Sequence, residues 1–446
     1  MSDLQISLTL ITFAAVIVLI AFDLIDMALA ALLGVCIFLV LGILENYDVA
    51  AAFRTAGAPV ALLFGGMVVA RVLAKTGIFE RVGDLYLRAT RGSGKRFLLL
   101  LVLMVAATCS VLPNATTVIL LAPVIIRVAK ELKLDFVGPM ILTAIVSNSA
   151  GMLTLVGDPA TFLVGSSIGM TFGHYLQKVS LGGLLAVFMV IPLLPVLMPQ
   201  IWRARCRLPD EQSKAPIEHP WFVALALSVL GLMVGLFFIG EHLPTRIVPP
   251  AVAIIGATLA LLVIYTVRIE PLDNVIRDVD WKTLIFLSAI FCLVQAFSKT
   301  GLLQGMAITF YNWFGTNFVL VALALLGGIG AMSCVLANIP VVAASLVMTK
   351  GYFVVAEAVP DAALAAGFTD WPAATLPVFI AMMFGGTLGG NATLIGASAN
   401  IVSVGICAKH GQHVSFGRFV RYGLPITLAQ LVMSAVYVIG LTWLGR

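Results

Sequence analysis

Asp158 is the residue whose type and surroundings most clearly predict chemistry. It is the only acidic residue between Asp135 and Asp210, and it lies in an apolar region interrupted by glycine and proline, GMLTLVGDPAT (151–161). A carboxylate at membrane depth costs about 2.5 to 3.5 kcal/mol on insertion scales, which a role in stability does not explain. We therefore predict that Asp158 carries a proton or attracts a cation. The alternative is that it caps a helix starting at Pro159, and the two roles are compatible.

Neutral polar side chains occur in four apolar segments, 112–117, 154–161, 336–340 and 393–400. Those able to hydrogen-bond a ligand are Asn114, Thr116, Thr117, Thr154, Thr161, Asn338, Thr393, Ser398 and Asn400. None of the four segments contains Lys or Arg, although a multiply charged anion usually binds beside a cation. The pattern favours a small neutral hydroxylated solute. The alternative, that glycine and proline there only serve helix packing, remains open.

Cysteine and histidine give weaker indications. Cys109 precedes the first polar segment and Cys334 the third, and a soft sulfur could bind trivalent arsenic, although Cys is also a common buried residue. The sequence has no HExxH, GxSxG or CxxC motif, and its five His show no metal-binding spacing. We therefore expect neither an enzyme, nor a bound metal or cofactor, nor a disulfide framework.

Composition identifies the elements that must position these residues. The 446 residues are 61% hydrophobic and 11% charged, with a mean hydropathy of +1.10. Such a chain is neither a soluble enzyme, nor disordered, nor a nucleic-acid binder, and it predicts an all-α polytopic membrane protein. Runs of about 20 apolar residues predict ten spans: 7–22, 27–43, 57–74, 137–168, 179–200, 221–240, 248–266, 283–297, 373–408 and 422–444.

Four regions depart from a simple span. Residues 97–126 and 318–349 have polar centres, VLPNATT and VLANIP, which indicate re-entrant hairpins. Spans 137–168 and 373–408 are interrupted by glycine and therefore predict broken helices. If 71–96 is cytoplasmic, 20 of the 26 Lys and Arg lie on that side. This places both termini in the periplasm of a bacterial inner membrane. It leaves open whether a soluble ATPase docks at the basic loops 81–96 and 203–207.

The two halves of the chain resemble each other. Lys-Thr-Gly at 75–77 recurs at 299–301, and Leu-Pro-Asn at 112–114 recurs as Leu-Ala-Asn at 336–338, both displaced by 224 residues. GMLTLVGDPAT matches GNATLIGASAN (390–400) at a displacement of 239. Residues 1–202 and 221–446 then form two repeats of five spans, joined by a cytoplasmic linker at 203–220. An odd number of spans gives the repeats opposite orientations, the inverted 5+5 architecture of secondary transporters.

Three stretches carry a family resemblance: LPNATTVILLAPV (112–124), SNSAGMLTLVGDPATFLVG (147–165) and GGTLGGNATLIGASANIVSVGI (385–406). They resemble the ArsB/NhaD-type permeases of the ion transporter superfamily, over nearly the whole chain. That superfamily includes arsenite pumps, sodium/proton antiporters, silicon exporters, the melanosomal P protein and dicarboxylate carriers. The resemblance implies an elevator-type transporter, in which a transport domain of both hairpins and both broken helices moves against a scaffold domain.

The resemblance also implies a residue set for the site. By the family's motifs, the set is Asn114, Thr116, Thr117, Thr154, Gly157, Asp158, Pro159, Asn338, Pro340, Asn391, Thr393, Gly396, Ser398 and Asn400. Many relatives have an acidic residue where this chain has Pro113, and Asn where it has Thr161. Loss of that acid weakens a sodium site and leaves Asp158 as the main ionisable residue.

Residues and resemblance together predict a secondary transporter that exports arsenite or antimonite as the neutral trihydroxide, in exchange for protons moving through Asp158. The alternatives are a sodium/proton antiporter, or a carrier of silicic acid or of a small dicarboxylate-like anion. The expected partners are this solute, protons and the lipid bilayer.

Overall fold

The structure is a computed structural model that describes residues 3–21, 24–206, 219–364 and 368–444. Within these ranges the chain is helical and contains no strand. The helices of the first half are α1 (Asp3–Ala21), α2 (Met27–Val40), α3 (Asn46–Ala74), α4 (Ile78–Thr90), α5 (Gly94–Cys109), α6 (Asn114–Glu131), α7 (Val137–Gly151), α8 (Pro159–Ser167), α9 (Phe172–Lys178), α10 (Ser180–Phe188), η1 (Ile191–Leu193), α11 (Leu194–Leu197) and α12 (Pro199–Arg203).

The helices of the second half are α13 (Pro220–Ile239), η2 (Gly240–His242), α14 (Pro249–Val267), α15 (Leu272–Arg277), α16 (Trp281–Lys299), α17 (Leu302–Phe314), α18 (Phe318–Ser333), α19 (Asn338–Val355), η3 (Asp361–Leu364), η4 (Ala373–Thr375), α20 (Leu376–Gly389), α21 (Ser398–Lys409) and α22 (Phe416–Leu444). Most of the predicted linker, 207–218, lies outside the described residues.

The all-α membrane class is confirmed, because eight of the described helices are long and apolar enough to cross a membrane. Seven of them fall in predicted spans, and the eighth, α19, belongs to the predicted second hairpin. The remaining predicted spans correspond to the short α2 and to two interrupted pairs, α7–α8 and α20–α21. Helix α3 starts eleven residues before the predicted span, because Glu45 and Asp48 form a capping box at its start.

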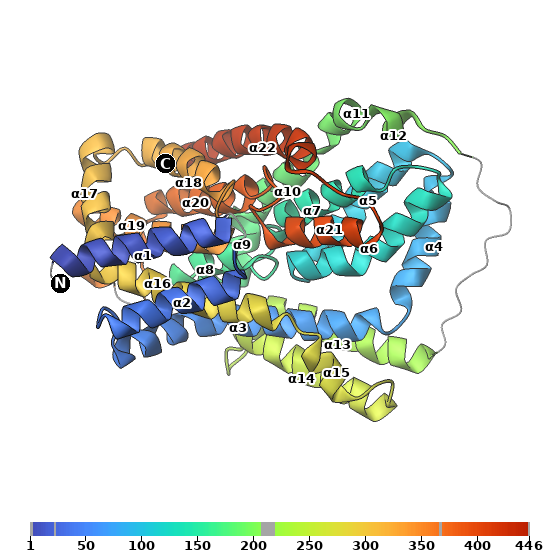
Figure 1. Ribbon diagram of the computed structural model, residues 1–446, viewed down its shortest axis with the longest axis horizontal. Helices are drawn as coiled ribbons and strands as arrows, with labels where there is room; N and C mark the ends of the chain where they lie inside the picture. The colour runs from blue at the N-terminus through green and yellow to red at the C-terminus, as the bar shows by residue number, and fades with distance from the viewer. Residues whose placement is uncertain (1–2, 22–23, 207–218, 365–367, 445–446) are drawn as a thin grey trace.

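The helices form two groups that lie along opposite sides of the molecule in Figure 1. The α3 group comprises α1–α3 and α13–α16, in which α3 packs against α14 and α16. The α7 group comprises α5–α8, α10 and α18–α22, in which α20 packs against α18 and α22. Both hairpins, α5–α6 and α18–α19, belong to the α7 group and face the α3 group through α6 and α19.

The repeated Lys-Thr-Gly sequence forms the same turn twice. Thr76 Oγ1 donates to Leu73 O at 2.6 Å and accepts from Ile78 N, and Thr300 Oγ1 makes the matching bonds to Phe297 O and Leu302 N. Gly77 and Gly301 follow at φ 70° and 76°, a region that glycine adopts without a steric penalty. The helices started by these turns, α4 and α17, lie at opposite ends of the molecule (Figure 1).

Ion pairs join both ends of α3 to α16 or to the segment that precedes α16. Near its start, Asp48 Oδ2 lies 2.7 Å from Lys299 Nζ at the end of α16. Near its end, Lys75 Nζ lies 3.0 Å from Glu270 and Arg71 lies 2.7 Å from Asp278, both in the segment before α16. These pairs fix the two helices against sliding along each other.

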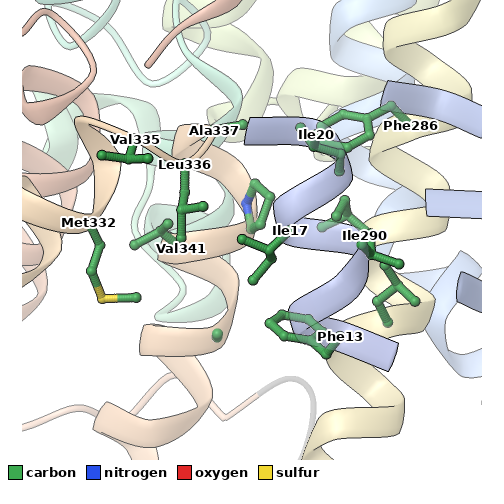
Figure 2. A pocket seen from close by; sticks show the side chains of 14 residues that line it. Phe13, Ile17, Ile20, Phe286, Ile290, Met332, Val335, Leu336, Ala337 and Val341 are labelled. Carbon is green, nitrogen blue, oxygen red and sulfur yellow. The ribbon is translucent and has the colours of Figure 1, made fainter. Parts of the chain in front are cut away.

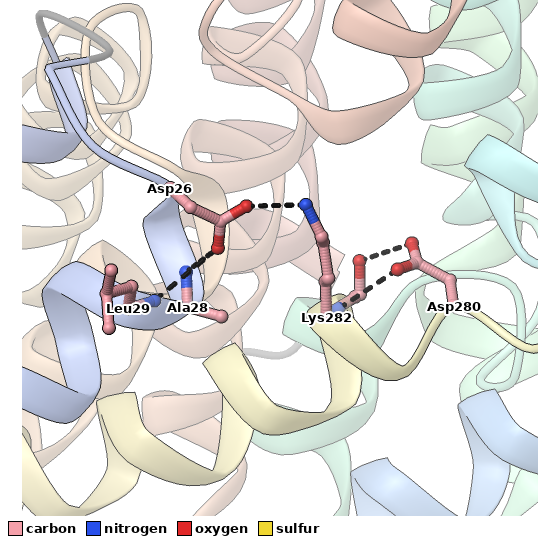
Figure 3. A network of polar contacts seen from close by, with 6 residues as sticks. Asp26, Ala28, Leu29, Asp280 and Lys282 are labelled. Atoms are coloured by element: carbon pink, nitrogen blue, oxygen red, sulfur yellow. Dashed lines mark hydrogen bonds and ion pairs between the residues drawn. The ribbon is translucent and has the colours of Figure 1, made fainter.

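A further ion pair joins the start of α2 to α16. Asp26 caps α2 by accepting from Ala28 N, and its Oδ2 lies 2.8 Å from Lys282 Nζ at the start of α16 (Figure 3). The Lys282 ammonium lowers the pKa of the Asp26 carboxyl, which favours its ionised form.

The two basic loops predicted on the cytoplasmic side lie side by side. Gly94 N donates to Ala204 O at 3.0 Å, and Cys206 N donates to Gly92 O at 2.8 Å. Lys95 Nζ lies over the Trp202 ring, 5.3 Å from its centre. The charges of 81–96 and 203–206 are therefore presented on one surface.

Candidate functional site

The four predicted polar segments are the turns within α5–α6, α7–α8, α18–α19 and α20–α21, and all four lie in the α7 group. Side chains of the first hairpin and of both interrupted helix pairs form a polar centre there. This centre contains mutually contacting, nearly fully buried side chains. They are Cys109, Asn114, Asn148, Asp158, Thr387 and Asn400. Two of the six, Asn148 and Thr387, were not among the predicted site residues.

The first half-site is built around Asn114, the first residue of α6. One atom of its side-chain amide faces the carbonyl oxygens of Gly157 and Ser147, at 3.1 and 3.2 Å. An amide nitrogen in that place donates to both. The other amide atom lies 3.5 Å from Asp158 Oδ1 and 3.4 Å from Asn148 Oδ1. Cys109 Sγ donates to Ser147 O at 3.0 Å.

The second half-site repeats this geometry around Asn338, the first residue of α19. An amide nitrogen of Asn338 placed in the same way donates to Gly396 O at 2.8 Å and to Ser333 Oγ at 2.6 Å. Ser333 Oγ in turn donates to Gly386 O at 2.6 Å. Ser333 thus takes the place that Cys109 takes in the first half, at the same displacement of 224 residues.

Gly157 and Gly396 are required because each lies against a turn of its own half. A Cβ at Gly157 would come within 2.6 Å of Gly151 O and 2.9 Å of Cys109 O. A Cβ at Gly396 would come within 2.6 Å of Gly390 O and 2.9 Å of Ser333 O. Real Cβ atoms do not approach so closely, so only glycine allows the hairpin turn and the helix break to touch.

Asp158 differs from its counterpart Ala397 in charge. Its Oδ2 accepts from Thr161 N at 3.0 Å, which caps α8, and from Thr387 Oγ1 at 3.1 Å. The side chain is 3% exposed, and no ion pair to it occurs within the described part of the chain. The carboxyl therefore has only neutral donors around it, and the predicted capping role is present.

Two hydrogen bonds among these six side chains cross from one half to the other. Thr387 of α20 reaches Asp158, and Asn148 Nδ2 of α7 donates to Asn400 Oδ1 at 3.1 Å. Asn148 and Thr387 are themselves displaced by 239 residues, the spacing that relates the two breaks. That spacing is the signal in the sequence that could have identified both.

Several of the predicted site residues have structural roles. Thr154 Oγ1 donates to Ser110 O at 2.6 Å, and Thr393 Oγ1 donates to Cys334 O, so each threonine fastens a helix break to the neighbouring hairpin turn. Thr161 Oγ1 donates to Asp158 O at 2.9 Å. These hydroxyls hold the turns together by bonds to backbone carbonyls.

The remaining predicted residues make no hydrogen bond to Asp158 within the described ranges. Thr117 is buried, and its hydroxyl has no hydrogen-bond partner among the described residues. Thr116 and Pro340 are partly buried, and Ser398 is exposed. Asn391 donates to Ser149 Oγ and Gln430 Oε1, both at 3.0 Å, and so belongs to a second polar cluster beneath α22.

The two cysteines proposed as thiol ligands do not occupy matching places. Cys109 is fully buried beside Asn114. Cys334 is one residue past the counterpart of Cys109, and its Sγ turns back to Gly330 O at 3.2 Å. A pair of thiols on one solute is therefore not formed. Among the described residues, no group of three His, Cys, Asp or Glu could hold a metal ion.

An all-helical membrane chain with paired hairpins, paired helix breaks and a buried polar centre between them defines the class of membrane transporters, not enzymes. Residues 17–369 match the model of the CitMHS family, described as citrate transporter, and this chain belongs to that family.

Curated relatives agree with this assignment. The chain is 42% identical to the uncharacterized transporter slr0753 of Synechocystis, over 96% of this chain and 95% of that one. It is 31% identical to the uncharacterized transporter Rv2684 of Mycobacterium tuberculosis, over 95% and 96%, respectively. The human P protein is 25% identical and aligns with 98% of this chain and 60% of its own length. Membership of the ion transporter superfamily is therefore confirmed, without an assignment to its arsenite branch.

The fold also has a solved counterpart. The YdaH transporter of Alcanivorax borkumensis superposes with a TM-score of 0.57, covering 89% of this chain and 88% of that one at 14% identity. A likeness at this identity concerns the fold alone.

Proposed function

We propose that this chain is a secondary active transporter in which the protonation of Asp158 drives the passage of a small neutral hydroxylated solute. Arsenite and antimonite, as trihydroxides, are the first candidates, exported from a bacterial cytoplasm in exchange for protons. The carrying observation is a carboxyl group buried among neutral donors, at the point where the first hairpin and the first helix break meet α20 of the second half.

The orientation of the Asn114 amide supports proton coupling. With its nitrogen donating to Gly157 O and Ser147 O, its oxygen is the atom that faces Asp158 Oδ1 at 3.5 Å. Two acceptor oxygens repel each other unless one carries a proton, and a protonated carboxyl can donate to the amide. Loss of that proton leaves a buried charge that neutral donors such as Thr161 N and Thr387 Oγ1 stabilise, which is unfavourable at membrane depth.

The charges of the site support a neutral solute. The half-sites contribute amides, hydroxyls, a thiol and one carboxyl, and no Lys or Arg side chain contacts them within the described residues. Citrate, the solute in the family's description, carries three carboxylates and would need cations that this centre lacks.

We further propose that the two halves, 1–202 and 221–446, are inverted repeats and that the α7 group moves against the α3 group in an elevator mechanism. The matching turns at Thr76 and Thr300, with α4 and α17 at opposite ends of the molecule, support the inversion. The ion pairs at both ends of α3 support a rigid scaffold. In this arrangement both termini are periplasmic.

The test is a proteoliposome assay with the purified chain, following arsenite under an imposed pH gradient with and without sodium. Citrate, with and without a divalent cation, is assayed in parallel. We expect arsenite movement that requires the pH gradient and is absent in Asp158→Asn. Citrate uptake without arsenite movement would replace the proposed solute by an anion.

A second candidate, a sodium/proton antiporter, is favoured by the same amide in the opposite orientation. With its oxygen toward these carbonyls, Asn114 places it 3.1 Å from Gly157 O and 3.2 Å from Ser147 O, an arrangement that a small hard cation stabilises. The amide nitrogen then donates to an ionised Asp158. Cation binding and proton binding would thus exclude each other. Sodium-dependent pH changes in the same liposomes, without solute movement, would support this candidate.

A further inference from the structure

An apolar crevice separates α1 and α16 from the turn of the second hairpin (Figure 2). Phe13 and Ile17 of α1 and Phe286 of α16 form one wall, and Val335 and Val341 on either side of the hairpin turn face them. Every side chain that lines the crevice is apolar. It therefore offers no hydrogen bond to water or to a hydrated solute.

The wall formed by α1 and α16 is fixed in place. The rings of Phe13 and Phe297 stack with their centres 5.0 Å apart, and Asp26 pairs with Lys282 where α2 begins (Figure 3). The crevice is therefore a gap between α1, packed on α16, and the hairpin turn.

The corresponding place at the first hairpin is more tightly packed. There Gly66 of α3 lies so close to Pro113 that an added Cβ would be 2.8 Å from Pro113 Cδ. Met233 and Phe237 of α13 line the smaller cavity that remains beside this contact. At the displacement of 224 residues, Ile290 replaces Gly66, and its side chain prevents the same approach by the second hairpin. The second hairpin therefore lacks the apolar packing that the contact of Gly66 with Pro113 provides at the first hairpin.

The crevice is continuous with the lipid-facing surface. Met332 and Val335 are each 51% exposed, and both belong to the hairpin of a membrane-spanning chain. Exposed apolar side chains at that depth contact lipid hydrocarbon. We propose that one acyl chain of a membrane lipid occupies this crevice and supplies the apolar volume that Gly66–Pro113 packing supplies at the first hairpin.

Photolabelling in nanodiscs tests the site. A phospholipid with a diazirine in its acyl chain is included at low mole fraction, the protein is extracted and washed in detergent, and only then irradiated and mapped by mass spectrometry. We expect the label at Met332, Val335 and Ile17 to survive washing. Label at Val432 and Val436 of α22, which are 66% and 67% exposed, should be lost, because lipid exchanges freely there. Equal loss at both places would overturn the proposal.

A variant that fills the crevice makes the test more specific. Ala344→Phe places a ring in the crevice from α19, and Val436→Phe adds the same ring to the exposed face of α22. Retained label at the crevice should fall to the level of α22 in Ala344→Phe and remain unchanged in Val436→Phe. Retained label in a folded Ala344→Phe would contradict the proposal. Since labelling does not involve the transported solute, its outcome is independent of the proposed function.

Discussion

The two half-sites of this transporter share a backbone and differ in chemistry. In both, an asparagine starts the second hairpin helix, a glycine lets the helix break touch the hairpin turn, and a threonine fastens the two. The first half places Asp158 where the second has Ala397, and Cys109 where the second has Ser333. The shared residues are those that hold the turns in place. The residues that differ are those whose protonation or polarity could determine which ion and which solute are transported.

The largest effect is expected from Asp158→Asn. The amide keeps the size of the side chain and an oxygen able to accept from Thr161 N, but it cannot release a proton. Transport driven by a pH gradient should fall to that of empty liposomes, while the yield of monodisperse protein remains near that of the wild type. Gradient-driven transport at the wild-type rate would show that the charge difference between the half-sites is not functional.

The glycines should behave alike if the backbone is shared. Gly157→Ala and Gly396→Ala each force a carbonyl oxygen to move, and overpacking of this kind costs about 1 to 3 kcal/mol. We expect both variants to lower the melting temperature in detergent by similar amounts. Gly235→Ala on α13, where nothing lies within 4 Å of the added Cβ, is the matched control and should be neutral or stabilising. A strong effect at one glycine alone would show that the half-sites are not equivalent.

Much of this comparison could be predicted from the sequence, because the repeated motifs are local. The helix breaks, the hairpin turns and the position of Asp158 follow from glycine, proline and charge within short apolar segments. Asn148 and Thr387 were missed because their partners lie in the other half, 252 and 229 residues away, and no local pattern indicates such contacts.

The direction of the Cys334 thiol depends on the register of the repeat. Neighbouring residues of a helix point about 100° apart, so a shift of one position from Ser333 to Cys334 turns the thiol away from Asn338. The repeat displacement of 224 residues identifies Ser333 directly, and it is a better guide to the site than residue type.

An intermediate effect is expected from Thr387→Val, which removes the bond that the second half donates to Asp158. A hydrogen bond to a charged group contributes about 1.5 to 3 kcal/mol, and one pH unit corresponds to about 1.4 kcal/mol. Because that bond stabilises the ionised carboxyl, its loss favours the protonated form. The midpoint of transport against pH should rise by about one to two units. Thr387→Ser keeps the hydroxyl and should keep the midpoint, whereas equal shifts in both variants would indicate a packing effect.

The smallest effect is expected from Cys109→Ser, which makes the first half-site resemble the second. Ser333 already donates to Gly386 O as Cys109 donates to Ser147 O, so a hydroxyl fits this geometry. Exchanging one donor for another should change stability by less than about 1 kcal/mol and leave arsenite transport substantial. Cys334→Ser is the companion variant, since its thiol bonds only to Gly330 O of its own helix and is not directed at the site. If Cys109→Ser abolished transport at normal expression while Cys334→Ser did not, Cys109 would be a ligand of the solute. The difference between thiol and hydroxyl would then matter as much as the difference between Asp158 and Ala397.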